Sequence, residues 1–257
     1  MIEGYEREYE IAGRRVRMPC VVRDASAGTA TFEADADAAR ALVPPAFEVV
    51  ETAPGRCHVT LAIIDYRDND LGDYDEVGIT FFVRPAGAGG SDAAGPEIGE
   101  TGLPAATEPG TGAEVGTYIH RLPVDQAFTC EAGRRIWGFP KTVEDIALLY
   151  ADRTLTATLL LGGELAFRLT VPRGGTVDMA PLPMVTYTLI DGVPHVTAFS
   201  QGGSRSQVLA GGDGVALELG EHPVAKELAA LGLPSTPLFT TWTEHMRGTF
   251  EAPRPLA

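Results

Sequence analysis

The sequence predicts an α+β protein that is mostly antiparallel β, with a few short helices. The 257 residues include 30 glycines and 19 prolines, a content of turn formers that favours many short elements over long helices. From residue 142 onward, strand-like segments recur with turn signals between them at intervals of roughly 8 to 12 residues, the spacing of a sandwich or barrel. The length also suffices to bury a core without a metal or disulfide. We therefore expect a single domain over residues 1–257.

The first part of the chain predicts strands around one short helix. The segments that alternate, or that are apolar and β-branched, are residues 29–34, 47–51, 58–66 and 77–84. Residues 35–45 predict a helix, with Asp35 as a plausible N-cap and prolines at its end. Residues 71–76 have the composition of a polar turn.

Residues 85–116 differ from everything around them. They are rich in glycine and proline and contain no aromatic residue. Such a segment buries too little apolar surface to fold alone, so we expect a mobile insertion between two strands.

The rest of the chain predicts mainly strands. The expected elements are a strand at 115–124, a short helix at 125–135, a series of strands between 143 and 220, a helix at 222–232 and a last strand at 238–250.

Charge and cysteine content exclude several classes of function. The net charge of −15 would repel nucleic-acid phosphates and anionic lipid surfaces, so we expect neither partner. The three cysteines are far apart in the sequence, which argues against a disulfide framework or a structural zinc site and favours the cytoplasm. We find no apolar stretch of about 20 residues and no signal-peptide pattern, so we expect no membrane span.

Lysine is rare in this chain. The 20 basic residues are 18 arginines and two lysines, Lys141 and Lys226. A guanidinium cannot lose its proton in a protein and cannot act as an amine nucleophile, whereas a lysine can. The retained lysines therefore suggest a lysine-specific role, although a coding bias toward arginine would also leave a few by chance.

The neighbourhood of Lys141 favours such a role. The segment GRRIWGFPK places Lys141 close to Trp137 and Phe139. An apolar site disfavours the ammonium and frees the amine, which can then form a Schiff base with a ketone. The alternative is a lysine whose stem covers apolar neighbours while its amine stays in water.

Three segments together resemble the acetoacetate decarboxylase superfamily. GRRIWGFPK (133–141) is similar to the family's Schiff-base segment, Gly-Arg-Glu, three residues, then aromatic-Pro-Lys. LGDYDEVG (71–78) is similar to its Leu-Gly-x-Tyr-x-Glu-x-Gly segment, and residues 32–49 resemble its strand, helix and Val-Pro stretch. Their order and spacing agree over most of the chain, apart from the insertion.

The resemblance implies both an architecture and a chemistry. It implies a cone-shaped β-barrel core, a homo-oligomer, a small keto-acid substrate and no cofactor or metal. It assigns the Schiff base to Lys141, acid–base catalysis to Glu76, and contact with the substrate carboxylate to Arg23, or to Arg134 if the N-terminal match is wrong. On the residues alone, Glu76 could equally be a solvated carboxylate in a turn.

Two departures from the family pattern leave the reaction open. Thr142 stands where decarboxylases often carry a second lysine, so desolvation alone must favour the neutral amine of Lys141. Arg135 replaces the acid of Gly-Arg-Glu. In both departures the sequence resembles superfamily members that act as pyruvate aldolase-dehydratases. We therefore expect a carbon–carbon lyase that decarboxylates a β-keto acid, with an aldolase-dehydratase or a catalytically inactive ligand-binding barrel as alternatives.

Overall fold

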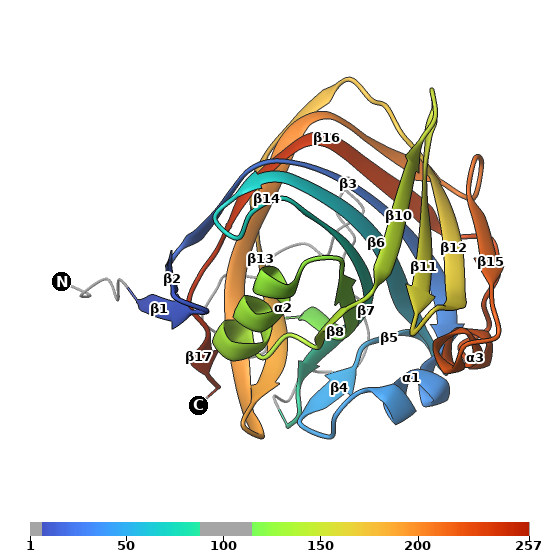
Figure 1. Cartoon of the computed structure of the whole chain (residues 1–257). Coiled ribbons are helices and arrows are strands. Elements are labelled where there is room, and N and C mark those ends of the chain that lie inside the picture. Colours follow the sequence, from blue (N-terminus) through green and yellow to red (C-terminus); the bar gives the residue numbers. More distant parts are fainter. Residues whose placement is uncertain (1–6, 88–114, 257) are drawn as a thin grey trace.

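A closed barrel of long strands forms the centre of the fold (Figure 1). The structure, a computed structural model, describes residues 7–87 and 115–256. Seven strands pair in a ring, in the order β7–β6–β3–β16–β14–β13–β8 and back to β7. Their bounds are β3 Cys20–Asp35, β6 Arg56–Asn69, β7 Tyr74–Pro85, β8 Gly116–Val124, β13 Val177–Ile190, β14 Val193–Ala210 and β16 Phe239–Phe250. The pairing is antiparallel except between β13 and β8, so the predicted mostly antiparallel class is confirmed.

A second sheet packs beside the barrel, on the right in Figure 1. Its strands, in the order β10–β11–β12–β15, are Asp145–Tyr150, Thr154–Leu161, Glu164–Pro172 and Ala216–Leu219. The remaining strands are β1 Glu8–Ile11, β2 Arg14–Arg17, β4 Phe47–Val49, β5 Glu51–Ala53, β9 Lys141–Val143 and β17 Arg254–Pro255. Of these, β9 pairs in parallel with β8 and thereby ties the lysine segment to the barrel.

The described helices are short, as the sequence predicts. They are α1 Ala36–Leu42, α2 Ala127–Ala132 and α3 Pro223–Ala230. The Asp35 carboxylate accepts a hydrogen bond from the Ala38 amide at 2.8 Å, which confirms the predicted N-cap. The predicted helix at 125–135 is split, because α2 passes into a π-helical turn, Gly133–Trp137, that ends at Gly138 with φ +69°.

The predicted polar turn at 71–76 is too long. Strand β7 already begins at Tyr74, so Glu76 lies within a barrel strand and its residue is buried. Pairing of Tyr66 with Tyr74 and of Ile64 with Glu76 extends the ladder to this point, and the two tyrosine rings stack at 4.6 Å. The solvated-turn interpretation of Glu76 is therefore wrong.

The predicted insertion at 85–116 falls between two paired strands. Strand β7 ends at Pro85, β8 begins at Gly116, and Val83 pairs with Gly116. Most of the insertion, residues 88–114, lies outside the described residues. Within the described ranges, no helix is both long enough and apolar enough to span a membrane.

The main hydrophobic core lies between the barrel and the second sheet. Phe32, Leu61 and Phe81 of the barrel pack there against Leu155 and Phe167 of β11 and β12. A second cluster, which includes Trp137 and Phe139, surrounds the segment that carries Lys141. The outer faces of the barrel strands thus supply the core, and their inner faces are left to line a cavity.

Candidate active site

The barrel interior contains a cavity with about 230 Å³ of free volume. Strand β7 shows how the sequence builds its wall, because every second residue from Tyr74 to Phe82 lines the cavity. The alternate residues face the core outside the barrel, as Val77 and Ile79 do. Lys141 and Glu76 are the charged residues among those that line the cavity in the described part of the chain.

Lys141 and Glu76 meet inside this cavity. Lys141 Nζ lies 2.8 Å from Glu76 Oε2, and the two side chains are only 4% and 8% exposed. Strand β9 brings the lysine to the barrel beside β8, where Lys141 pairs with Leu122, while Glu76 on β7 pairs with Val124 of the same β8. Two segments far apart in the sequence thus place an amine and a carboxylate in direct contact.

Helix α2 supplies a third polar group. Lys141 Nζ donates a hydrogen bond to Thr129 Oγ1 at 3.0 Å, and Thr129 is fully buried. The amine also lies 4.8 Å from the centre of the Tyr74 ring, within the range of a cation–π contact. The buried amine therefore has partners on three sides, which satisfies a group that would otherwise be costly to bury.

Two tyrosines and a cysteine complete the polar end of the cavity. Burial raises the pKa of Tyr66 well above its usual value, and the Glu76 carboxylate, to which Tyr66 is hydrogen-bonded, raises it further. Burial likewise raises the pKa of Tyr74, whose hydroxyl interacts with Thr129 and Tyr66. Burial also raises the pKa of Cys20 to about 12, so its thiol is a poor nucleophile at neutral pH.

Gly133 makes room for the stem of Lys141. A Cβ at this position would lie 2.6 Å from Cδ and 2.9 Å from Cε of Lys141. Trp137 and Phe139, which the sequence places near the lysine, line the same cavity and stack on each other at 5.6 Å. The glycine, the aromatic residues and the lysine of GRRIWGFPK thus act in one local arrangement.

The structure does not bring Arg23 or Arg134 to Lys141. On β3, Cys20 and Val22 line the cavity, so the alternation of the strand turns Arg23 outward, where it pairs with Asp68 and Asp70 and is 45% exposed. Arg134 is exposed on the π-helical turn and lines a separate surface depression. As a correction to the sequence-based assignment, neither guanidinium lines the cavity.

Other residues that the sequence singles out lie elsewhere. Lys226 is exposed on α3. His120 Nε2 lies 2.8 Å from Glu227 Oε2, and burial lowers the pKa of this histidine. Among the described residues, no group of three or more His, Cys, Asp or Glu side chains is arranged to hold a metal ion.

Sequence reasoning missed Thr129, Tyr66 and Tyr74. Tyr74 stands two residues before Glu76, so strand alternation could have placed it on the same face. Thr129 lies in α2, twelve residues before the lysine, and nothing in the sequence around it indicates that its hydroxyl is buried beside the amine.

This arrangement can carry out amine chemistry on a carbonyl group. A lysine ammonium becomes a nucleophile when it passes a proton to an adjacent carboxylate. The carboxylic acid formed in this way can later give the proton to the substrate. The apolar walls exclude bulk water around the reacting atoms, which strengthens these interactions.

Comparison with known proteins points to one family. A family model described as acetoacetate decarboxylase matches residues 10–249. Among curated proteins, none matches the chain significantly.

Several solved structures share the fold. An acetoacetate decarboxylase from Legionella pneumophila superposes with a TM-score of 0.62 at 20% identity, with 93% of this chain and 87% of that chain covered. An acetoacetate decarboxylase-like enzyme from Sphingomonas wittichii gives 0.54 at 16% identity, with 94% of each chain covered. The enduracididine biosynthesis enzyme MppR, in complex with pyruvate, gives 0.58 at 14% identity, with coverages of 93% and 91%.

Proposed function

Because the chain belongs to the acetoacetate decarboxylase family, we propose that it is a lyase that decarboxylates a β-keto acid through an imine on Lys141. The observation that carries this proposal is the contact of a buried lysine amine with a buried carboxylate inside an apolar cavity. The chemistry requires no metal or organic cofactor, because the protonated imine itself accepts electrons.

The proposed reaction has four steps. The Lys141 amine adds to the ketone, and loss of water gives an iminium ion. The bond between the α-carbon and the carboxylate then breaks, its electron pair moves toward the iminium nitrogen, and carbon dioxide leaves. The resulting enamine takes a proton on carbon, and water finally hydrolyses the imine and releases the ketone.

Glu76 is proposed to move the protons in these steps. Its carboxylate is within hydrogen-bond distance of the amine, so it can accept a proton as the imine forms. As the acid, it can return a proton to the enamine. The hydrogen bond from Tyr66 would hold the carboxylate toward the amine.

The absence of arginine from the cavity favours decarboxylation over the aldolase-dehydratase reaction. All 18 arginines lie in the described parts of the chain, and none of them lines the cavity. A carboxylate without a cationic partner is stabilised when it leaves as neutral carbon dioxide. A pyruvate aldolase-dehydratase would keep its substrate carboxylate to the end of the reaction, and would gain more from an arginine partner.

The aldolase-dehydratase remains the second candidate. The MppR relative was solved in complex with pyruvate. In that reaction the enamine of pyruvate attacks an aldehyde and water is lost. A barrel that binds a small ligand without reacting is the third possibility. Assembly into a homo-oligomer, a single domain over residues 1–257 and a cytoplasmic location belong to the same proposal.

Borohydride trapping tests the imine. With a β-keto acid, sodium borohydride should fix a covalent adduct that peptide mass mapping places on Lys141. Lys141→Arg should abolish trapping and carbon dioxide release, because a guanidinium keeps the charge but offers no free amine. The control Lys226→Arg should behave as the parent.

Product analysis separates the candidates. Carbon dioxide and a ketone support the decarboxylase, and an unsaturated keto acid formed from pyruvate and an aldehyde supports the aldolase-dehydratase. No adduct with any ketone would leave the ligand-binding barrel, whereas full turnover by Lys141→Arg would exclude an imine on Lys141.

A further inference from the structure

The cavity extends well beyond the reacting groups. The side chains of β7 that line it run from Glu76 through Gly78 and Thr80 to Phe82. Six residues of strand correspond to roughly 20 Å at about 3.3 Å per residue. Acetoacetate, whose ketone carries only a methyl group beyond the reacting carbons, would occupy a small part of this length.

The walls beyond Glu76, as formed by the described residues, carry no charged side chain and combine apolar residues with threonines. The large apolar side chains that line this region are Phe82, Ile119, which pairs with Thr80, and Val185, next to the Thr186 that pairs with Thr117 beside Phe82. Of the threonines that also line the cavity, Thr29, Thr31, Thr60 and Thr186 use their hydroxyls within the protein. Thr31 and Thr60 share a hydrogen bond of 2.9 Å, and the Thr186 hydroxyl donates to a backbone carbonyl at 3.0 Å. The region therefore favours hydrocarbon over a polar or charged group.

Two small residues leave the way open between the reacting end and this apolar region. Ala62 and Gly78 face each other across β6 and β7, two cross-strand pairs beyond Ile64 and Glu76 and thus on the same inward face. A Cβ at Gly78 would lie 3.5 Å from Leu122 Cδ1 and 3.6 Å from the Ala62 Cβ, which are ordinary contacts. Close backbone packing thus does not require glycine here, and the small side chains leave space that a ligand can use.

On the basis of the proposed function, we infer that the substrate is a β-keto acid whose ketone carries an extended apolar chain. The carboxylate end lies beside Lys141 and Glu76, and the chain passes Ala62 and Gly78 into the apolar region. Loss of carbon dioxide from this acid, with uptake of one proton at the α-carbon, yields a methyl ketone that keeps the whole chain.

A series of substrates tests this inference on the parent enzyme. We expect kcat/KM for carbon dioxide release to rise from acetoacetate through β-ketohexanoate to β-ketooctanoate. Burial of one methylene corresponds to about fourfold, so the four added methylenes of the whole series should span roughly two- to three-hundredfold. A value that stays level or falls with chain length would overturn the inference.

A substitution in the passage provides a second test. Ala62→Ile should reduce the ratio of kcat/KM for β-ketooctanoate over acetoacetate by at least about tenfold, because the added side chain fills the passage. Ala147→Ile on the exposed face of β10 is the matched control and should keep the parent ratio. An unchanged ratio in Ala62→Ile would contradict the inference.

The two proposals fail in different ways. Trapping of Lys141 by acetoacetate without any preference for longer chains would contradict only the extended substrate. A lack of trapping with every member of the series would overturn the proposed function, and the substrate inference with it.

Discussion

The position of the Lys141 amine depends on contacts with several other residues. Thr129 and Glu76 hold the amine by hydrogen bond and ion pair, and Gly133 leaves room for its stem. Each of these contacts comes from a different element, so the amine is fixed by the fold as a whole and not by its local sequence. Positioning of this kind matters because a misplacement of about 1 Å can cost an enzyme about a hundredfold in rate.

Gly133→Ala tests this dependence. The added Cβ would lie 2.6 Å from Lys141 Cδ, so the lysine stem must shift away from its contact with Glu76. We expect kcat to fall by about tenfold to a hundredfold and imine trapping to slow. Thermal stability should change little, because alanine is the better helix former.

Arg135→Ala is the control for this variant. Arg135 is exposed on the same turn, where it pairs with Glu131 across one helical turn, and its loss should leave kcat near the parent value. Parent-like turnover by Gly133→Ala would show that the stem of Lys141 can adapt, and that the glycine has another role.

At the scale of the element, the sequence predicts where strands lie better than it predicts which residues of a strand face the cavity. The alternation of apolar residues predicts the strands, and the segments 133–141 and 71–78 predict Lys141 and Glu76 as candidate site residues. The direction of Arg23 could not be predicted in this way, because β3 shifts register between Val22 and Ala25. Residues 20 and 22 line the cavity before this irregularity and residues 29 and 31 line it afterwards, so the inward phase changes within one strand.

The start of β7 at Tyr74 could not be predicted for a related reason. Residues 71–76 have the composition of a turn, and only pairing with β6 makes Tyr74 to Glu76 a strand. Such pairing is a long-range contact that local propensity does not encode. Thr129 likewise reaches Lys141 only because α2 packs against the barrel.

Strand β7 also carries a carboxylate with a perturbed proton affinity. Burial raises the pKa of Asp75 to about 7, and the charges of Asp125, Asp65 and Asp73 act in the same direction. An unfolded aspartate titrates near 3.9, so the native state binds the proton more tightly than the unfolded state does. The contribution of this group to stability is therefore lost as pH rises from about 4 to about 7.

Asp75→Asn should accordingly stabilise the protein more at higher pH. The gain in the free energy of unfolding should be near zero below about pH 4, grow up to about pH 7 and then remain constant. Urea unfolding of the variant and the parent at several pH values measures it. Asp145→Asn, at an exposed site on β10, is the control. A gain that does not depend on pH would exclude the expected titration of Asp75.

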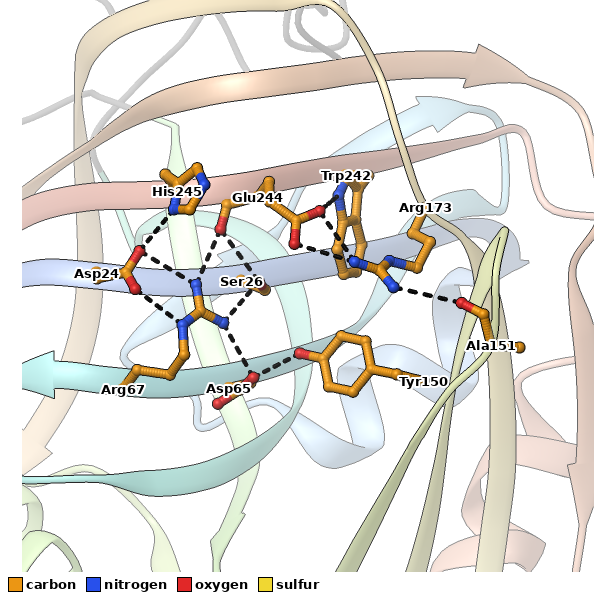
Figure 2. Close-up of polar contacts among 10 residues, drawn as sticks. All are labelled: Asp24, Ser26, Asp65, Arg67, Tyr150, Ala151, Arg173, Trp242, Glu244 and His245. Carbon is orange, nitrogen blue, oxygen red and sulfur yellow. Dashed lines mark hydrogen bonds and ion pairs between the residues drawn. The ribbon is translucent and has the colours of Figure 1, made fainter.

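At the scale of the whole molecule, a polar network joins the barrel to the second sheet (Figure 2). Arg173, directly after β12, binds Glu244 of β16 at 3.0 and 3.3 Å and donates to the Ala151 carbonyl, and its guanidinium lies 4.9 Å from the Tyr150 ring. Beside it, Arg67 of β6 binds Asp24 of β3 through two hydrogen bonds. The network connects elements that otherwise meet through the hydrophobic core, and so it fixes how the second sheet sits on the barrel.

Arg173→Met should therefore destabilise the protein far more than loss of an ordinary surface arginine. Glu244 is only 15% exposed, and the variant would leave its carboxylate with Trp242 Nε1 as the remaining side-chain donor at 3.2 Å. We expect a loss of about 2–4 kcal/mol in the free energy of unfolding, measured with urea, because a largely buried charge loses its partner. The double variant Arg173→Met/Glu244→Gln should recover part of this loss, since the uncompensated charge is then removed.

Arg168→Met on β12 is the matched control, because its partner Glu218 is 58% exposed and surface pairs contribute about 1 kcal/mol or less. Equal losses in the two arginine variants would mean that the network does not hold the second sheet to the barrel.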